Sequence, residues 1–178
     1  MENNDVLRRL RYALQLDDAE AARLAGLGGE SVTVEAMSLF RLRSEDPAAV
    51  PCPDRALGAL LSGLVLDRRG PPEQARNDHE EDRYACDNNS VLKRVKVALA
   101  MRSDEVVACI GAGGGGAVTD SVIGSFLRRP GARNFQGLGD QMLRRFLSGL
   151  AMSRREADTD TDTDTDAGSG SDGSAPHG

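Results

Sequence analysis

The chain carries one sequence pattern twice. Asn3–Leu7 returns as Asn88–Leu92 after an offset of 85 residues, with Asp5 replaced by Ser90. Leu61–Leu64 returns as Leu147–Leu150 after an offset of 86, so one residue was inserted between the two matches. A duplication kept in register in this way indicates two copies of one structural unit. It constrains the architecture of the chain but says nothing about its chemistry.

Apolar spacing predicts four helices in each copy. The last helix is the clearest, because large apolar residues recur at the i, i+3, i+4 and i+7 positions of one helix face. These residues are Leu57, Leu60, Leu61 and Leu64 in the first copy, and Leu143, Phe146, Leu147 and Leu150 in the second. Strand signals are weak, since aromatic residues make up only 3% of the chain and apolar and polar residues show no sustained alternation. We therefore expect an all-α fold of two tandem four-helix repeats.

Polar residues and glycines recur at the expected helix positions. The asparagine pairs at 3–4 and 88–89 are expected to cap the first helices, because an asparagine side chain accepts a hydrogen bond from a free backbone N–H. Asp54 and Asp140 are expected to cap the fourth helices in the same way. Gly63 and Gly149 lie inside those fourth helices, where glycine is unfavourable. Their presence in both copies predicts a close helix crossing.

The repeats define the domain organisation. Residues 1–70 form the first repeat, 71–87 a charged linker, 88–155 the second repeat and 156–178 an Asp/Thr/Gly/Ser tail. The tail lacks residues that could anchor a core and is expected to be disordered. Each repeat is small for an independent core. We therefore expect the two repeats to pack together as an intramolecular pseudo-dimer.

Charge is segregated along the chain. The two repeats carry net charges of −2 and +7, the linker −4 and the tail −7. The basic second repeat is a candidate polyanion-binding surface. A solvated helix face whose charge is balanced by the tail remains the alternative. The candidate residues are Lys93, Arg94, Lys96, Arg128, Arg129, Arg133, Arg144 and Arg145.

Catalytic groups are scarce, so we do not expect an enzyme. A nucleophile needs a nearby base, yet the two histidines, His79 and His177, lie in the linker and the tail. We expect no metal site, because the three cysteines have no ligand spacing and the Asp-Thr run lacks the glycine and glutamate of a calcium loop.

The glycine-rich segment 111–116 suggests a dinucleotide site, but the repeat register argues against it. Gly111, Gly113 and Gly116 have the spacing of a pyrophosphate-binding turn that follows a strand. The register instead places 106–110 on a helix, and no second apolar strand follows. We expect a glycine-rich loop and no cofactor.

Two segments bear on localisation and on DNA binding. The polar start of the chain and the absence of a run of about 20 apolar residues predict a cytoplasmic protein that does not contact membranes. The helices expected between residues 18 and 43 resemble a helix-turn-helix in outline. Their connection is long, and the arginines Arg41 and Arg43 lie near the end of the second helix, whereas a recognition helix usually reads bases from its start.

Several segments resemble the YehS-like bacterial proteins. They are Asn3–Tyr12, Cys52–Asp54 before Leu60–Leu64, and Asn134-Phe135 before Gly139–Gln141 and Phe146–Leu150. That family is built from a duplicated domain of unknown function, and the resemblance covers about residues 3–155. It implies a small cytosolic bacterial protein and supplies no catalytic residues. The chain departs from the family pattern at Gly113–Gly116, at Leu138, where a cysteine would be expected, and in the tail.

Together these observations predict a non-enzymatic binding or adaptor module. The basic second repeat would contact an acidic protein or RNA, and the acidic tail would compete for the same surface. A DNA-binding regulator that uses the helix-turn-helix-like pairs is the alternative hypothesis.

Overall fold

The computed structural model describes residues 1–43, 45–71 and 84–163, and side chains as far as Arg155. Eight helices and no strand lie within these residues, which confirms the all-α prediction. Most of the linker and residues 164–178 of the tail lie outside the described residues. The first repeat comprises α1 (Asn3–Leu14), α2 (Asp18–Leu27), α3 (Val34–Phe40) and α4 (Asp54–Arg69). The second comprises α6 (Asn88–Ala98), α7 (Ser103–Ala112), α8 (Asp120–Phe126) and α9 (Asp140–Thr163).

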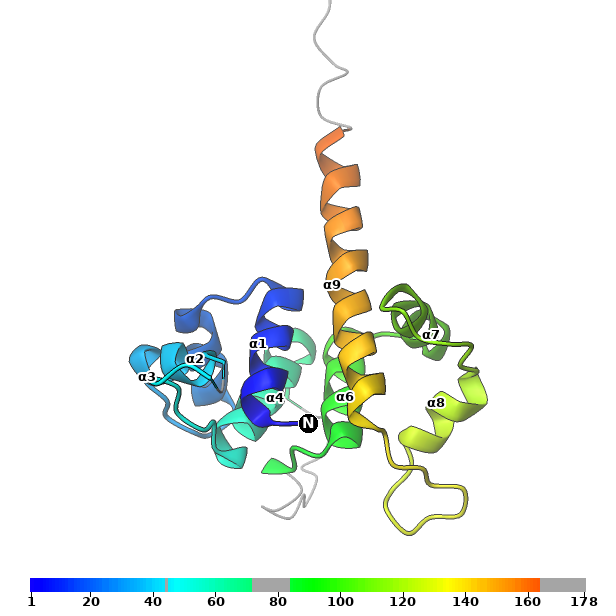
Figure 1. The fold of residues 1–178 in the computed structure, drawn as a ribbon, viewed down its shortest axis with the longest axis horizontal. Helices are drawn as coiled ribbons and strands as arrows, with labels where there is room; N and C mark the ends of the chain where they lie inside the picture. The colour runs from blue at the N-terminus through cyan, green and yellow to red at the C-terminus, as the bar shows by residue number, and fades with distance from the viewer. Residues whose placement is uncertain (44, 72–83, 164–178) are drawn as a thin grey trace, which may run out of the picture.

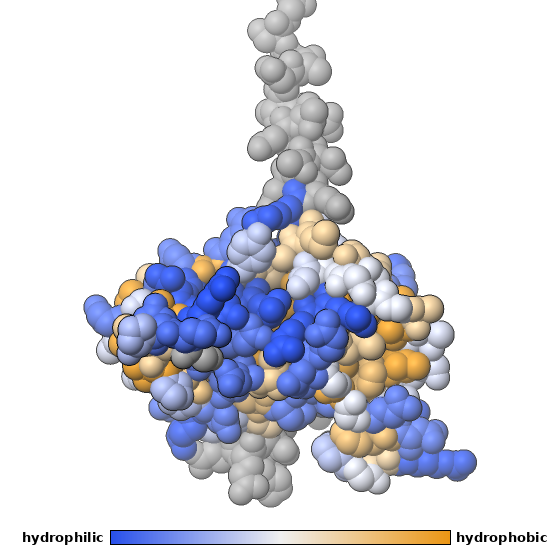
Figure 2. All heavy atoms as spheres, in the orientation of Figure 1, coloured by the Kyte–Doolittle hydropathy of each residue, from blue (hydrophilic) through white to orange (hydrophobic). Residues whose placement is uncertain are grey.

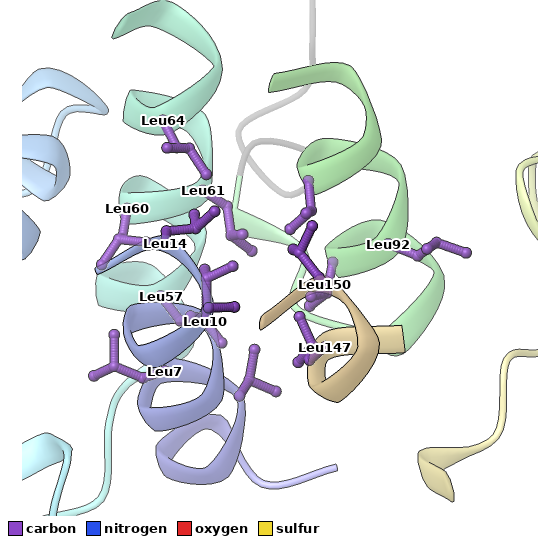
Figure 3. Packing of buried hydrophobic residues seen from close by; sticks show 14 of the residues in the cluster. Leu7, Leu10, Leu14, Leu57, Leu60, Leu61, Leu64, Leu92, Leu147 and Leu150 are labelled. Carbon is purple, nitrogen blue, oxygen red and sulfur yellow. The ribbon is translucent and has the colours of Figure 1, made fainter. Parts of the chain in front are cut away.

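At the centre of the molecule, the first and last helices of one repeat pack on the last and first helices of the other. Helix α1 packs mainly on α9 of the other repeat, and α4 packs on α6, as Figure 1 shows. Figure 3 shows Leu10 and Leu61 on one side facing Leu147 and Leu150 on the other. All four side chains are buried in one continuous apolar cluster. The predicted pseudo-dimer is therefore present, and its core contains helices from both repeats.

Glycines set the crossing of the second and fourth helix in each repeat. A Cβ atom added to Gly63 of α4 would lie 1.8 Å from the carbonyl oxygen of Leu24 in α2. The equivalent atom on Gly149 of α9 would lie 1.7 Å from the carbonyl oxygen of Cys109 in α7. Since no real Cβ tolerates such distances, only glycine allows these helices to pack so closely. The predicted close crossing is confirmed.

The recurring asparagines do not cap their helices as we expected. The residues in the N-cap positions of α1 and α6 are Glu2 and Asp87, so both asparagine pairs lie within the first turn. The Asn3 side chain instead donates to the carbonyl oxygen of Cys52 at 3.0 Å, and Asn4 donates to that of Val50 at 2.8 Å. The asparagines thus attach the start of each repeat to the chain that leads into its last helix.

The second copy repeats this attachment. The Asn88 side chain donates to the carbonyl oxygen of Leu138 at 2.9 Å, and the amide of Leu138 donates to Asn89 Oδ1 at 2.8 Å. Asp54 and Asp140 are also not caps, because each is the first residue of its helix. Each accepts a hydrogen bond from the first asparagine of its repeat, at 2.7 and 2.8 Å. Sequence patterns show only neighbouring residues, so these aspartates were expected to be caps. Their actual partners, the asparagines, lie about 50 residues away in the sequence.

Two further segments bear on the sequence predictions. Residues 106–110 lie inside α7, as the repeat register predicted, so no strand precedes the glycine-rich loop. Gly113 in that loop packs against α9, where an added Cβ would lie 2.0 Å from the carbonyl oxygen of Arg145. The last helix continues to Thr163, into the region predicted as tail.

Candidate anion-binding groove between α1 and α9

The predicted basic residues are distributed over three elements. Lys93, Arg94 and Lys96 lie on α6, and Arg144 and Arg145 on α9. Arg128, Arg129 and Arg133 lie on the connection between α8 and α9, which projects away from α1 at the lower right of Figure 1.

Several of these cations bind acceptors within the protein. Arg94 donates to the carbonyl oxygens of Gly58 and Ala85 at 3.3 and 3.2 Å, and Lys96 donates to that of Met101 at 2.7 Å. Arg144 bonds to Asp5 of α1, with Nε 3.1 Å from Oδ2. Arg144 therefore belongs to the contact between α1 and α9.

That contact contains a cationic surface that our sequence analysis did not identify. Arg11 and Tyr12 follow Arg8 on α1 by about one helical turn, and all three line the same pocket. Arg41 approaches them from the end of α3 and Arg155 from α9. Figure 2 shows hydrophilic residues gathered over the middle of this face, where Figure 1 places α1 and α9.

Asp5 organises the arginines at one end of the surface. Its side chain is 15% exposed and pairs with Arg8, with Arg9 at 2.9 Å and with Arg144 at 3.1 Å. Burial alone would raise the pKa of Asp5, but the three guanidinium groups hold it below the ordinary value of an aspartate. One carboxylate thus holds three arginines from two repeats, so this cluster keeps an excess of positive charge.

Asp18 orders the arginines at the other end. Arg11 Nη1 lies 2.6 Å from Asp18 Oδ1, and Arg41 Nε lies 3.3 Å from the same oxygen. Arg11 is only 10% exposed and also donates to the carbonyl oxygen of Leu16. Burial lowers the pKa of Arg11, an effect that Asp18 opposes and Arg41 reinforces. Arg41 is 48% exposed, so its guanidinium remains accessible from solvent.

Two adjoining hollows lie along the groove and share Tyr12 and Arg155. The cationic pocket has a volume of about 450 Å³ and is lined by Arg8, Arg11, Tyr12, Gln15, Leu16, Arg41 and Arg155. The apolar slot has a volume of about 270 Å³ and is lined by Arg9, Tyr12, Leu147, Ser148, Ala151, Met152 and Arg155. Tyr12 is 57% exposed and Met152 51% exposed. The guanidinium carbon of Arg155 lies 4.4 Å from the centre of the Tyr12 ring.

The repeat register relates this surface to the basic residues predicted from the sequence of the second repeat. Lys93, Arg94 and Lys96 are the counterparts of Arg8, Arg9 and Arg11, and Lys96 contacts Met101 as Arg11 contacts Leu16. At the second copy, however, Val97 replaces Tyr12 and Leu127 replaces Arg41. The net charge of −2 on the first repeat concealed its arginines. The recurrence of Arg8, Arg11 and Tyr12 on one helix face was a signal that could have revealed them.

The family model for a protein of unknown function, DUF1456, matches residues 3–70 and 88–156. The chain belongs to this family. An uncharacterized protein of Escherichia coli strain K12, YehS, is 33% identical over 151 residues, which cover 85% of this chain and 95% of YehS. The predicted resemblance to YehS-like proteins is thereby confirmed. No solved structure matches the chain.

The DUF1456 matches coincide with the two helical repeats, and each contains one wall of the groove. Helix α1 belongs to the first match, and the part of α9 that lines the groove belongs to the second. The groove is therefore formed only when the two copies of the family domain pack together.

Other parts of the described structure offer little chemistry. Burial raises the pKa of both Cys52 and Cys86 to about 12, which opposes thiolate formation. No group of three or more potential metal ligands occurs among the described residues. None of the described helices is long and apolar enough to span a membrane. The helices corresponding to a recognition helix, α3 and α8, have seven residues each and an acidic residue in the first turn, Glu35 or Asp120.

Proposed function

We propose that this protein is a non-catalytic binding module for single-stranded RNA and that RNA binds in the groove between α1 and α9. The observation that supports this proposal is the convergence of arginines from α1, α3 and α9 beside an exposed tyrosine. Guanidinium groups bind phosphate through paired, charge-assisted hydrogen bonds. Aromatic rings provide the surface on which unpaired bases stack.

The tyrosine favours RNA over an acidic protein as the partner. The acidic side chains of a peptide would use the arginines but would make no use of the exposed side of Tyr12 or of the neighbouring apolar slot. Single-stranded RNA presents both phosphate charge and unstacked bases. Of the eight cations predicted from sequence, Arg144 contributes to this groove, because it holds α1 and α9 together through its ion pair with Asp5.

Two arginines of the groove allow a clean test. Arg8 and Arg41 share their carboxylates with other arginines, so replacing both leaves Asp5 paired with Arg144 and Asp18 paired with Arg11. The R8Q/R41Q variant should therefore fold normally. The matched control, R129Q/R133Q, removes the same charge from the exposed α8–α9 connection.

Binding of a short, labelled single-stranded RNA to the full chain is measured by fluorescence anisotropy over a range of salt concentrations. We expect R8Q/R41Q to weaken binding about tenfold or more at low salt. We also expect the slope of log affinity against log salt to fall by about 0.7 for each phosphate that the variant no longer neutralises. The control should bind as the unmodified chain does.

Three results would contradict the proposal. Equal weakening in the control variant would place RNA on the second repeat, as sequence charge alone suggested. Tighter binding to a defined duplex DNA than to single-stranded RNA would favour the DNA-binding alternative. Negligible affinity for both nucleic acids would leave the arginines as a solvated surface.

A further inference from the structure

The cationic pocket and the apolar slot adjoin each other, and this arrangement specifies more than a general affinity for RNA. Tyr12 and Arg155 contribute to the lining of both hollows. A ligand that fills both must therefore carry a planar, weakly polar group directly beside an anionic group. A single nucleotide has this composition, since its base and its phosphate are joined through one ribose.

The apolar slot suits the base. The exposed Met152 supplies most of its apolar surface from α9, above the buried Leu147 and Ala151, and Ser148 supplies a hydroxyl. Tyr12 and Arg155 form a stacked pair at its edge. Bases in protein–RNA complexes stack both on aromatic rings and on arginine planes, so this pair offers either surface to a base.

The distribution of positive charge points to the end of a strand rather than to its interior. A strand that passes through a groove is contacted by cations spread along its backbone. Here Arg8, Arg11 and Arg41 line one pocket, and two of them come from successive turns of the same helix. A phosphomonoester carries about −1.5 to −2 charges near neutral pH. An internal phosphodiester carries a single charge and fewer free oxygens.

We infer that the groove recognises the terminal nucleotide of a single-stranded RNA that ends in a phosphomonoester, with the base in the apolar slot and the phosphate among Arg8, Arg11 and Arg41. This inference rests on the proposed function, because it names which part of the RNA the groove binds. The same chemistry occurs at a 5′ and at a 3′ phosphorylated end, and the experiment separates the two.

The experiment measures binding of the full chain to four forms of one RNA sequence. These forms carry a 5′ phosphate, a 3′ phosphate, both or neither. We expect one of the two ends to raise affinity about tenfold when phosphorylated, because a dianion forms stronger charge-assisted hydrogen bonds with guanidinium groups. Uridine and adenosine monophosphates, titrated as free nucleotides, should compete for the site where the nucleosides do not.

Tyrosine variants test the position of the base. Tyr12 is exposed, so Y12A should fold and should lose about fivefold or more in affinity, whereas Y12F should retain the affinity of the unmodified chain. Tyr84 provides the matched control, because it also lies beneath an arginine, with the guanidinium carbon of Arg55 4.7 Å from its ring centre. Y84A should leave affinity unchanged.

The outcomes distinguish this inference from the proposed function. If R8Q/R41Q weakens RNA binding but all four RNA forms bind equally, the groove binds RNA and the terminal inference is wrong. If Y12A and Y84A bind alike, the base does not use the slot and the inference is again wrong. If no RNA form binds at all, both proposals fail together.

Discussion

Asp5 connects the two repeats electrostatically. It lies on α1 and holds Arg144 of α9 together with two arginines of its own helix. Its counterpart in the second repeat is Ser90, which bonds to Asp87 and cannot play this part. The duplicated framework therefore carries an asymmetric charge network at the contact between α1 and α9.

Replacing Asp5 with asparagine should destabilise the protein near neutral pH and much less in acid. The pKa of Asp5 is lowered in the folded protein, so its contribution is present above the unfolded value of about 3.9 and is lost as pH falls through the folded value. Because the Asp5 side chain is mostly buried, we expect D5N to lower the free energy of unfolding by about 1–2 kcal/mol at neutral pH.

Urea denaturation at several pH values measures this effect. The difference between D5N and the unmodified chain should narrow as the solution becomes more acidic. E35Q removes an exposed acid on α3 and should change stability by less than about 0.5 kcal/mol at any pH. A difference between D5N and the unmodified chain that stays constant across pH would show that Asp5 acts through packing rather than charge.

At the scale of helices, the glycines of the crossings should be far less replaceable than neighbouring glycines. G63A and G149A force backbone atoms apart, because the added Cβ would overlap the carbonyl oxygens of Leu24 and Cys109. We expect each to cost roughly 1–3 kcal/mol or more, the range for overpacked cores. Thermal or urea unfolding of the full chain measures the cost.

The same helix pairs contain their own controls. Gly26 in α2 and Gly111 in α7 have open space where a Cβ would lie. G26A and G111A should therefore be neutral or stabilising by up to about 1 kcal/mol, because alanine favours a helix. Equal effects at crossing and open positions would mean that helix propensity, and not the crossing, explains the recurring glycines.

Elements with a local signal could be predicted from sequence, and long-range partners could not. The leucine spacing located α4 and α9, because both helices carry apolar residues at a regular helical interval. The role of the asparagine pairs was missed because their partners lie almost 50 residues away. The groove was missed for the same reason, since Arg41 reaches α1 only through the fold.

At the scale of the whole molecule, the acidic tail and the groove share one helix. Helix α9 forms a wall of the groove and continues past Arg155 to Thr163, into the segment that carries seven acidic residues. Tethering gives such a segment a high effective concentration near its own domain. We therefore expect the tail to compete for the groove, as our sequence-based hypothesis expected it to compete for the basic second repeat.

Removing residues 156–178 should tighten RNA binding at low salt. The gain in affinity should shrink as salt rises, because screening limits the reach of each charge to about 10 Å at 0.1 M. Fluorescence anisotropy with the truncated and full chains measures this difference. A full-length chain with asparagine in place of the tail aspartates is the control, because it removes charge but keeps length. If truncation tightens binding and neutralisation does not, the tail acts by obstruction instead of charge.

The exchange of partners between repeats predicts how a single repeat behaves. Without α9 and α6, residues 1–70 would leave the inner faces of α1 and α4 exposed to water. Two copies of this fragment can cover both faces if α1 of each packs on α4 of the other, as α1 packs on α9 and α4 on α6. We expect helicity by circular dichroism to rise with fragment concentration, together with a dimer in analytical ultracentrifugation.

Adding residues 84–178 should convert this dimer into a one-to-one complex, because the native partners also supply the Asp5–Arg144 pair. A monomeric fragment with full helicity would show that each repeat has a sufficient core of its own, and the groove would then be an interface between two independent domains.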